Sequence, residues 1–208
     1  MNQSQNEKVE QIYKRYYSTL NPLIQAYEVL AREFPIEIMN EIRAIFTHLA
    51  RCYGRSCTDQ EIDENITKAE RHMHRAVLDG FKYNCFAIQD WITKFKKDYA
   101  GVLEYVDNGK FLGKFISNEL KAQDLFLVAK THEANGEDDD VFYDAYEAAY
   151  NEYFSIYKST REKIKDIQNI KKQQDKNYRK KFIISLIFNG FMAICTVASV
   201  IFGLISIL

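Results

Sequence analysis

The sequence predicts an all-α protein, a helical bundle whose long C-terminal helix continues into a single transmembrane helix. Among the 208 residues there are only 8 Gly and 2 Pro, whereas these two types make up roughly 12% of an average protein. A β-sandwich or an α/β fold uses them in its many turns, so both classes are disfavoured. In addition, apolar residues recur at helical spacing, and the last 27 residues carry no charge.

Three helices are predicted in the first part of the chain. A polar-faced helix over residues 6–20 is followed by Asn21-Pro22, where we expect Asn as the N-cap and Pro at the first position of a new helix. That second helix ends near Phe34-Pro35. A third helix over 36–53 carries apolar residues at helical spacing and ends before Gly54.

Capping and turn patterns delimit the next elements. Residues 58–61, Thr-Asp-Gln-Glu, have the pattern of a capping box at the start of a fourth helix, which extends to about residue 105. Asp107-Asn108-Gly109 predicts a turn, a shorter helix follows over 111–133, and Asn135-Gly136 predicts another turn.

The last predicted helix begins at the acidic residues 137–140, whose charge suits a helix N-terminus. Its apolar residues follow the 4-3 alternation of a coiled-coil seam, with Thr160 in one seam position. These residues are Tyr146, Tyr150, Tyr153, Tyr157, Ile164 and Ile167. The seam either faces another helix outside the domain or packs back on residues 1–134 as core, and we favour the second for Tyr146 to Tyr157.

Charge is separated along the chain behind a formal net charge of −1. Residues 158–181 have a formal charge of +7, residues 182–208 have none, and residues 1–157 have −8. We therefore predict a cytoplasmic helical domain over 1–140, a long amphipathic and then basic stalk helix over 141–181, and a transmembrane helix over 182–208.

The C-terminal tail, residues 182–208, has the composition of a membrane-spanning helix. Sixteen of its 27 residues are Leu, Ile, Val or Phe, which favours insertion by roughly 5–10 kcal/mol. A helix of this length is about 40 Å long, enough for a hydrocarbon core of about 30 Å. With no apolar run near Met1 to serve as a signal peptide, we expect this tail to be the anchor.

Basic residues directly before the tail orient it. By the positive-inside rule they stay in the cytoplasm, which predicts a single-pass protein with its N-terminus on that side. They are Lys171, Lys172, Lys176, Arg179, Lys180 and Lys181. Anionic lipid headgroups are their expected partner, and RNA is the alternative.

Small and hydrogen-bonding residues recur on one face of the tail at intervals of three and four. This tail stripe consists of Ser185, Asn189, Ala193, Thr196, Ser199, Gly203 and Ser206. In lipid, such residues let helices approach closely and bond to one another. The stripe therefore predicts a homo-oligomer, in which several copies could line a pore. The alternative is an anchor that tolerates these residues without using them.

The cysteines indicate free thiols rather than a metal site. Cys52 and Cys57 have a C-x4-C spacing, but there is no second close pair, and His72 and His74 complete no familiar ligand array. We expect no metal and no other cofactor. Because two histidines at i and i+2 point to different sides of a helix, we interpret them as surface or border residues.

The third helix contains Asn40-Glu41-Ile42-Arg43-Ala44-Ile45-Phe46-Thr47-His48-Leu49, in which Arg43 and His48 have an Arg-x4-His spacing. In an all-helical domain this motif resembles that of the HEPN superfamily, whose RNases build a composite site from two copies. The resemblance implies that Arg43 stabilises phosphate charge and that His48 acts as general acid or base on a ribose hydroxyl. Here Ala44 follows the arginine, where many catalytic members have Asn, Asp or His. The other interpretation is two border residues of an amphipathic helix, or a buried hydrogen-bonded pair.

A divergent HEPN-like domain joined to a transmembrane helix in a small protein resembles the membrane accessory proteins of type VI-B CRISPR systems. That resemblance implies homo-oligomeric pores in the bacterial inner membrane, antiviral defence, and an RNA-guided RNase system as partner. Three functions are therefore open: a membrane-perturbing defence effector, a membrane-tethered dimeric RNase using Arg43 and His48 without a metal, and a tail-anchored scaffold.

Overall fold

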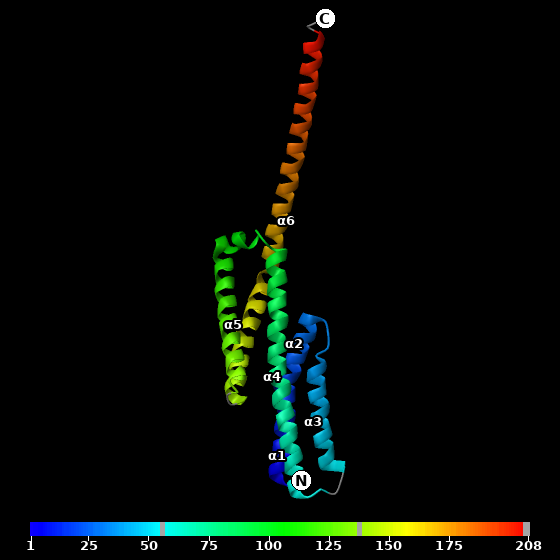
Figure 1. Ribbon diagram of the computed structural model, residues 1–208, viewed down its shortest axis with the longest axis vertical. Helices are drawn as coiled ribbons and strands as arrows, with labels where there is room; N and C mark the ends of the chain where they lie inside the picture. The colour runs from blue at the N-terminus through cyan, green and yellow to red at the C-terminus, as the bar shows by residue number, and fades with distance from the viewer. Residues whose placement is uncertain (55–56, 137–138, 206–208) are drawn as a thin grey trace. The chain divides into compact units, whose positions relative to one another are not determined.

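The protein is helical throughout its described part. The computed structural model describes residues 1–54, 57–136 and 139–205, without the side chains of residues 54, 139, 140, 194 and 197–205. Within these ranges every regular element is a helix and no strand occurs (Figure 1). The predicted all-α class is confirmed.

The N-terminal helices run into one another without a break. Helix α1, Gln3–Arg15, continues through a π-helical turn, η1, Tyr16–Leu20, into α2, Asn21–Ala31. The prediction that Asn21 caps a new helix is wrong, because its backbone is helical and its N–H bonds to the carbonyl of Tyr16. Pro22 does lie in the first turn of α2. It has no N–H to donate, and the wider π turn absorbs that loss.

Helices α3, Ile36–Gly54, and α4, Asp59–Asp98, pack against each other. The predicted capping box at the start of α4 is confirmed. The Thr58 N–H donates to Glu61 Oε2 at 2.8 Å, and the Glu61 N–H donates to Thr58 Oγ1 at 3.3 Å. Hydrogen bonds from the Thr58 N–H and the Thr58 hydroxyl to Glu61 Oε2 hold the pKa of the exposed Glu61 carboxyl below its ordinary value.

A glycine in the middle of α4 allows α2 to approach closely. Gly80 is buried, and a Cβ built there would lie 3.0 Å from Leu23 Cδ1. One turn later, Asn84 Nδ2 donates to the Leu23 carbonyl at 2.9 Å and to the Gly80 carbonyl at 2.8 Å. The glycine therefore serves helix packing, and α4 passes through it without interruption.

Helix α4 ends at Asp98, earlier than predicted, and a 3-10 segment, η2, spans Leu103–Gly109. The predicted turn at Asp107, Asn108 and Gly109 is confirmed, because all three have positive φ, at 49°, 56° and 85°. Helix α5 then covers Lys110–Ala134, and α6 covers Asp139–Ile205. Gly136, between them, also has a positive φ of 65°, which a glycine adopts without strain.

The chain forms two compact units. The first comprises Met1–Asp98 and Gly113–Arg161, and the second comprises Tyr99–Leu112 and Glu162–Leu208. The beginning of α6 thus belongs to the bundle, whereas the predicted domain boundary at residue 140 excluded it. Side chains with no more than 1% exposure fill the first unit, among them Leu20, Ile38, Ile66, Val77, Ile88, Ile92, Tyr146, Tyr153 and Ile156.

The second unit also contains buried apolar side chains. Val102, Leu103, Val106 and Ile167 are buried, and Lys163 forms an ion pair with Asp107 at 3.2 Å. No helix in the described part of the chain is long and apolar enough to cross a membrane. The transmembrane helix over 182–208 stays a prediction.

Candidate functional site

The two residues of the Arg-x4-His motif lie on different sides of α3. Arg43 is exposed, whereas His48 is half-buried against α4. The Nδ1 atom of His48 lies 3.0 Å from Oδ1 of Asn65 on α4. Among the described residues, no hydrogen bond joins Arg43 to His48. One copy of the chain therefore does not assemble the predicted pair, and its catalytic role stays a prediction.

A second histidine joins His48 instead. The ring of His72 on α4 stacks on that of His48, with centroids 5.4 Å apart and an angle of 19° between the planes. The Nδ1 atom of His72 lies 2.6 Å from Oε2 of Glu41. The antiparallel packing of α3 on α4 thus brings together four polar residues, which we call the histidine cluster: Glu41, His48, Asn65 and His72.

The hydrogen bonds of the histidine cluster determine how its rings can act. The Asn65 Nδ2 donates to the Glu61 carbonyl at 2.8 Å, so its Oδ1 faces His48 and accepts a hydrogen bond from the ring Nδ1–H. The Nε2 of a neutral His48 then carries a lone pair and is a base. The Glu41 carboxylate accepts from His72 Nδ1 and is an ion-pair partner for this ring when it is protonated. The cluster can therefore provide one base and one acid.

Sequence reasoning missed Asn65 and His72 as partners of His48, and Glu41 as the partner of His72. The prediction that His72 is a border residue rested on the geometry of α4 alone. Its neighbour in sequence, His74, points elsewhere and stacks on Tyr143 at 4.9 Å. No periodicity within one helix could pair His72 with His48, because the pair depends on the register between α3 and α4.

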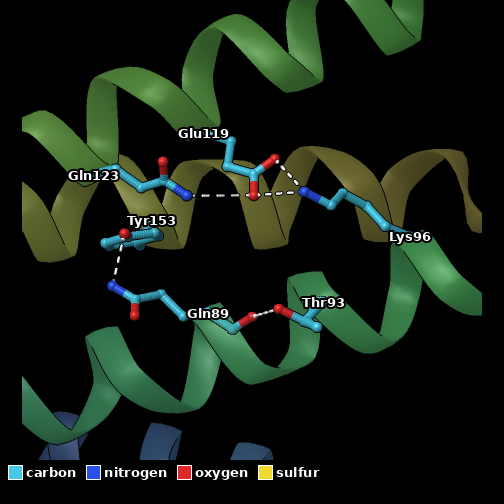
Figure 2. Close-up of polar contacts among 6 residues, drawn as sticks. All are labelled: Gln89, Thr93, Lys96, Glu119, Gln123 and Tyr153. Atoms are coloured by element: carbon cyan, nitrogen blue, oxygen red, sulfur yellow. Dashed lines mark hydrogen bonds and ion pairs between the residues drawn. The ribbon is translucent and has the colours of Figure 1, made fainter.

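A second group of polar residues lines a cavity of about 470 Å3 between α4, α5 and α6 of the first unit. Figure 2 shows Glu119 and Gln123 of α5 across from Gln89 of α4, with Tyr153 of α6 between them. The Lys96 Nζ lies 2.8 and 3.0 Å from the two oxygens of Glu119. Gln89 Nε2 donates to Tyr153 Oη at 2.7 Å.

The chemistry of this cavity is that of a structural network. Glu119 is almost buried, and its charge is balanced by Lys96. Burial raises the pKa of Tyr153 to about 12, so this phenol stays neutral at physiological pH. The polar groups mainly satisfy one another and tie three helices together. They carry no sequence motif, and only the packing of the three helices shows their connection.

The tail stripe is exposed as far as its side chains are described. Ser185, Asn189, Ala193 and Thr196 are all exposed. The Thr196 hydroxyl donates to the Met192 carbonyl at 2.8 Å, which is how a helical threonine satisfies itself without a partner. The side chains of Ser199 and Gly203, and all of Ser206, lie outside the described residues. Association through this stripe stays a prediction.

The basic residues before the tail are also accessible. Lys171 is half-buried, and its Nζ lies 5.0 Å from the centre of the Tyr99 ring. The other five are exposed, namely Lys172, Lys176, Arg179, Lys180 and Lys181. Five neighbouring cations with accessible side chains can contact an anionic surface without any rearrangement of the helix.

All four cysteines are free thiols in the structure. Cys52 is buried, which raises its pKa, and Cys57 donates to the Arg51 carbonyl at 3.3 Å. Within the ranges that the structure describes, no group of three or more His, Cys, Asp or Glu side chains could hold a metal ion.

Comparisons with protein-family models, with curated proteins and with solved structures found no match to this chain.

Proposed function

We propose that this protein is a membrane-anchored, self-associating accessory or effector protein of bacterial antiviral defence. In this proposal the helical bundle lies in the cytoplasm and the tail crosses the inner membrane once. The tails of several copies form an oligomeric pore or another assembly that perturbs the membrane. The defence role and the RNA-guided RNase partner derive from the architecture and the Arg-x4-His motif, which resemble those of the type VI-B accessory proteins.

The observation that carries the proposal is the exposure of the start of the tail. Eight large apolar side chains between residues 182 and 192 are 50–68% exposed. They are Phe182, Ile183, Ile184, Leu186, Ile187, Phe188, Phe191 and Met192. Covering them is worth on the order of 10 kcal/mol, since full burial of one such side chain contributes roughly 1.5–3 kcal/mol.

The distribution of these residues supports lipid as the main cover. At 100° per residue, the eight side chains point in directions all around the helix, so a single protein neighbour cannot cover all of them. The exposed cations Arg179, Lys180 and Lys181 directly precede this apolar segment. Each basic residue at an anionic surface contributes about 1 kcal/mol to binding.

Vesicle flotation tests the anchor. The full chain should float with vesicles of phosphatidylethanolamine and phosphatidylglycerol in a 3:1 ratio and should resist extraction by high salt. Ile184→Lys combined with Ile187→Lys should abolish flotation, because charges in the hydrocarbon core cost several kcal/mol. As a control, Leu127→Lys, at a 65% exposed position of α5, should float normally. Flotation of the double variant in high salt would contradict the anchor.

A separate variant tests association through the tail stripe. Replacing Asn189, Thr196 and Ser199 together by Leu removes three of the five hydrogen-bonding side chains of the tail stripe and keeps the segment apolar. We expect intact flotation with smaller oligomers and lost antiviral protection. Unchanged oligomers and unchanged protection would exclude the stripe as the assembly surface.

A second candidate function is supported by the histidine cluster. We propose as the alternative a membrane-tethered, metal-independent RNase that acts as a dimer through Arg43 and His48. The Nε2 of His48 would remove the proton of a ribose 2′-hydroxyl, whose oxygen attacks the phosphorus and forms a cyclic phosphate. A protonated His72 would give its proton to the departing 5′-oxygen. Lys68 and Arg75, three or four residues from His72 on α4, are exposed and could contact phosphates.

RNA cleavage in the presence of a metal chelator tests this alternative. If it holds, His48→Ala and His72→Ala should each reduce cleavage at least about 100-fold, in line with the loss of a general acid or base. His74→Ala, which changes the neighbouring histidine outside the cluster, is the matched control for unaltered cleavage. Absence of cleavage by the wild type, together with lost protection in His48→Ala, would assign the residue a structural role.

A further inference from the structure

Helix α3 carries two separate apolar stripes. The first faces the bundle core and is buried; it consists of Ile38, Ile42, Ile45, Leu49 and Cys52. The second, which we call the outer stripe, has all its members exposed; it consists of Ile36, Met39, Arg43, Phe46, Ala50 and Tyr53. Intervals of 3, 4, 3, 4 and 3 residues separate the members of the outer stripe, which is the alternation of a two-helix coiled-coil seam.

The exposure of the outer stripe is large for a helix in a folded domain. Ile36 is 67% exposed, Met39 37%, Phe46 58% and Tyr53 68%. The core stripe lies on an adjacent face of α3, about 110° around the helix, and the bundle leaves most of the surface of Ile36, Phe46 and Tyr53 uncovered. Apolar side chains in a row on a surface, here interrupted only by Arg43, indicate an interaction site.

When two copies of α3 run in opposite directions, the residues of their outer stripes complement one another. If a second copy of α3 runs antiparallel, Ile36 meets Tyr53, Met39 meets Ala50, and Arg43 meets Phe46 of the second copy. Each large side chain thus faces one that it can pack against, and the arginine lies on an aromatic ring, a favourable contact. In a parallel pair, Arg43 would face Arg43, which costs free energy.

The helix dipoles favour the same orientation. An antiparallel pair places the positive N-terminus of each α3 beside the negative C-terminus of the other. A parallel pair would bring like ends of the two dipoles together.

We propose that two copies of this chain associate through the outer stripe, with their α3 helices antiparallel around a two-fold axis between residues 44 and 45. This inference rests on the self-association in the proposed function and specifies a surface for it in the bundle, separate from the tail. Such an interface is isologous: both copies use the same residues.

The size of the interface fits association on a membrane. Phe46 and Tyr53 are each more than half exposed, and an aromatic side chain buries about 150–250 Å2. Four such rings therefore supply roughly 400–600 Å2, and Ile36 and Met39 raise the total toward the ~1,000 Å2 at the lower limit of specific interfaces. An interface of this size is weak in dilute solution and is strengthened when tails hold the copies in one membrane.

Charge exchange at positions 43 and 46 tests the register. Phe46→Arg places an arginine opposite Arg43 of the second copy at two symmetric points, and it should weaken dimerisation about 100-fold. Adding Arg43→Glu to Phe46→Arg restores opposite charges across an antiparallel pair and should recover most of the dimer. In a parallel pair the double variant would place like charges together and stay monomeric. Mass measurements in detergent report both effects across a range of concentrations, on full chains that also carry Leu at positions 189, 196 and 199, so that the tails do not associate.

Two controls separate this proposal from that of the anchor. Leu127→Arg introduces the same charge at a 65% exposed position of α5 and should leave the dimer unchanged. All variants should float with the vesicles described above, because each keeps an apolar tail. If the wild type does not float, the anchor is contradicted, and the mass measurements still test the outer stripe.

Phe46→Ala, a milder change, should weaken the dimer about tenfold. A Phe46→Arg variant that dimerises like the wild type, or a double variant that stays monomeric, would overturn the proposal.

Discussion

Two parts of the same helix, α6, differ in whether their large side chains are buried or exposed. Between residues 142 and 160 one row of apolar side chains is buried, and in it Tyr146 and Tyr153 are fully buried. Between residues 182 and 192 the apolar side chains surround the helix and are exposed. One row indicates one protein neighbour, whereas an apolar surface on all sides indicates a surrounding apolar medium. The pattern along a helix therefore shows what kind of partner covers it.

The largest difference between the two parts of α6 is expected when one tyrosine is removed from each. Tyr146→Ala leaves a cavity in the core and should lower the free energy of unfolding by about 3–5 kcal/mol. Tyr178→Ala, on the same helix at a 77% exposed position, should change it by less than about 0.5 kcal/mol. Urea denaturation followed by circular dichroism measures both. Similar losses in the two variants would mean that the far part of α6 is packed against protein.

Two isoleucines of the second unit, Ile167 and Ile183, differ in the same way. Ile167 is completely buried, whereas Ile183 is 56% exposed. Ile167→Ala should destabilise this unit by about 2–4 kcal/mol, seen as faster amide exchange in residues 162–170, and Ile183→Ala should leave this exchange unaltered. Equal exchange rates in both variants would contradict a small core around Ile167.

A smaller effect should appear where Tyr146 contacts Glu133. Burial opposes ionisation of Glu133, but its hydrogen bonds with Lys82 and Tyr146 outweigh this and hold its pKa below the ordinary 4.5. Tyr146→Phe removes one bond, of 2.6 Å. At neutral pH it should cost about 1 kcal/mol, a modest value because Glu133 is 35% exposed and partly screened by water.

The sign of the pH dependence follows from that lowered pKa. Stabilisation by ionised Glu133 is complete above its unfolded pKa and is lost as the pH falls through the folded value. The difference between wild type and Tyr146→Phe should therefore shrink below about pH 4.5. Denaturation curves at pH 7 and pH 3 measure it, and a constant difference would show that Glu133 is not involved.

The smallest expected effect concerns a polar residue within the buried row. Thr160 is fully buried, and its hydroxyl has no hydrogen-bond partner within the described residues. Thr160→Val keeps the shape and removes the unsatisfied group, so the free energy of unfolding should rise by up to about 1 kcal/mol. Thermal denaturation detects this as a higher Tm. A clear decrease in Tm would indicate that the Thr160 hydroxyl forms a stabilising hydrogen bond in the folded protein.

Much of the fold was predictable because its signals act over a few residues. The Thr58–Glu61 capping box, the positive φ of Asp107, Asn108 and Gly109, and the helical spacing in α3 all depend on contacts within a turn or two. The exception, Asn21, shows the limit of such rules. An asparagine before a proline suits an N-cap, but the chain keeps its helical hydrogen bonds through a π turn instead.

The candidate site was predictable only in part, for the same reason. Arg43 and His48 could be selected from their spacing, but His72 reached His48 only through the packing of α3 on α4. Likewise, the sequence of α3 shows apolar residues on more than one side, and only burial separates the core stripe from the outer stripe.

By itself, the sequence determined the all-helical class, most helix ends and the apolar, uncharged tail, because these depend on composition and on neighbours along the chain. Which histidines meet and which face of α3 stays exposed became visible only in the packed structure. Those outcomes depend on the register between helices that are far apart in sequence, and no local preference encodes that register.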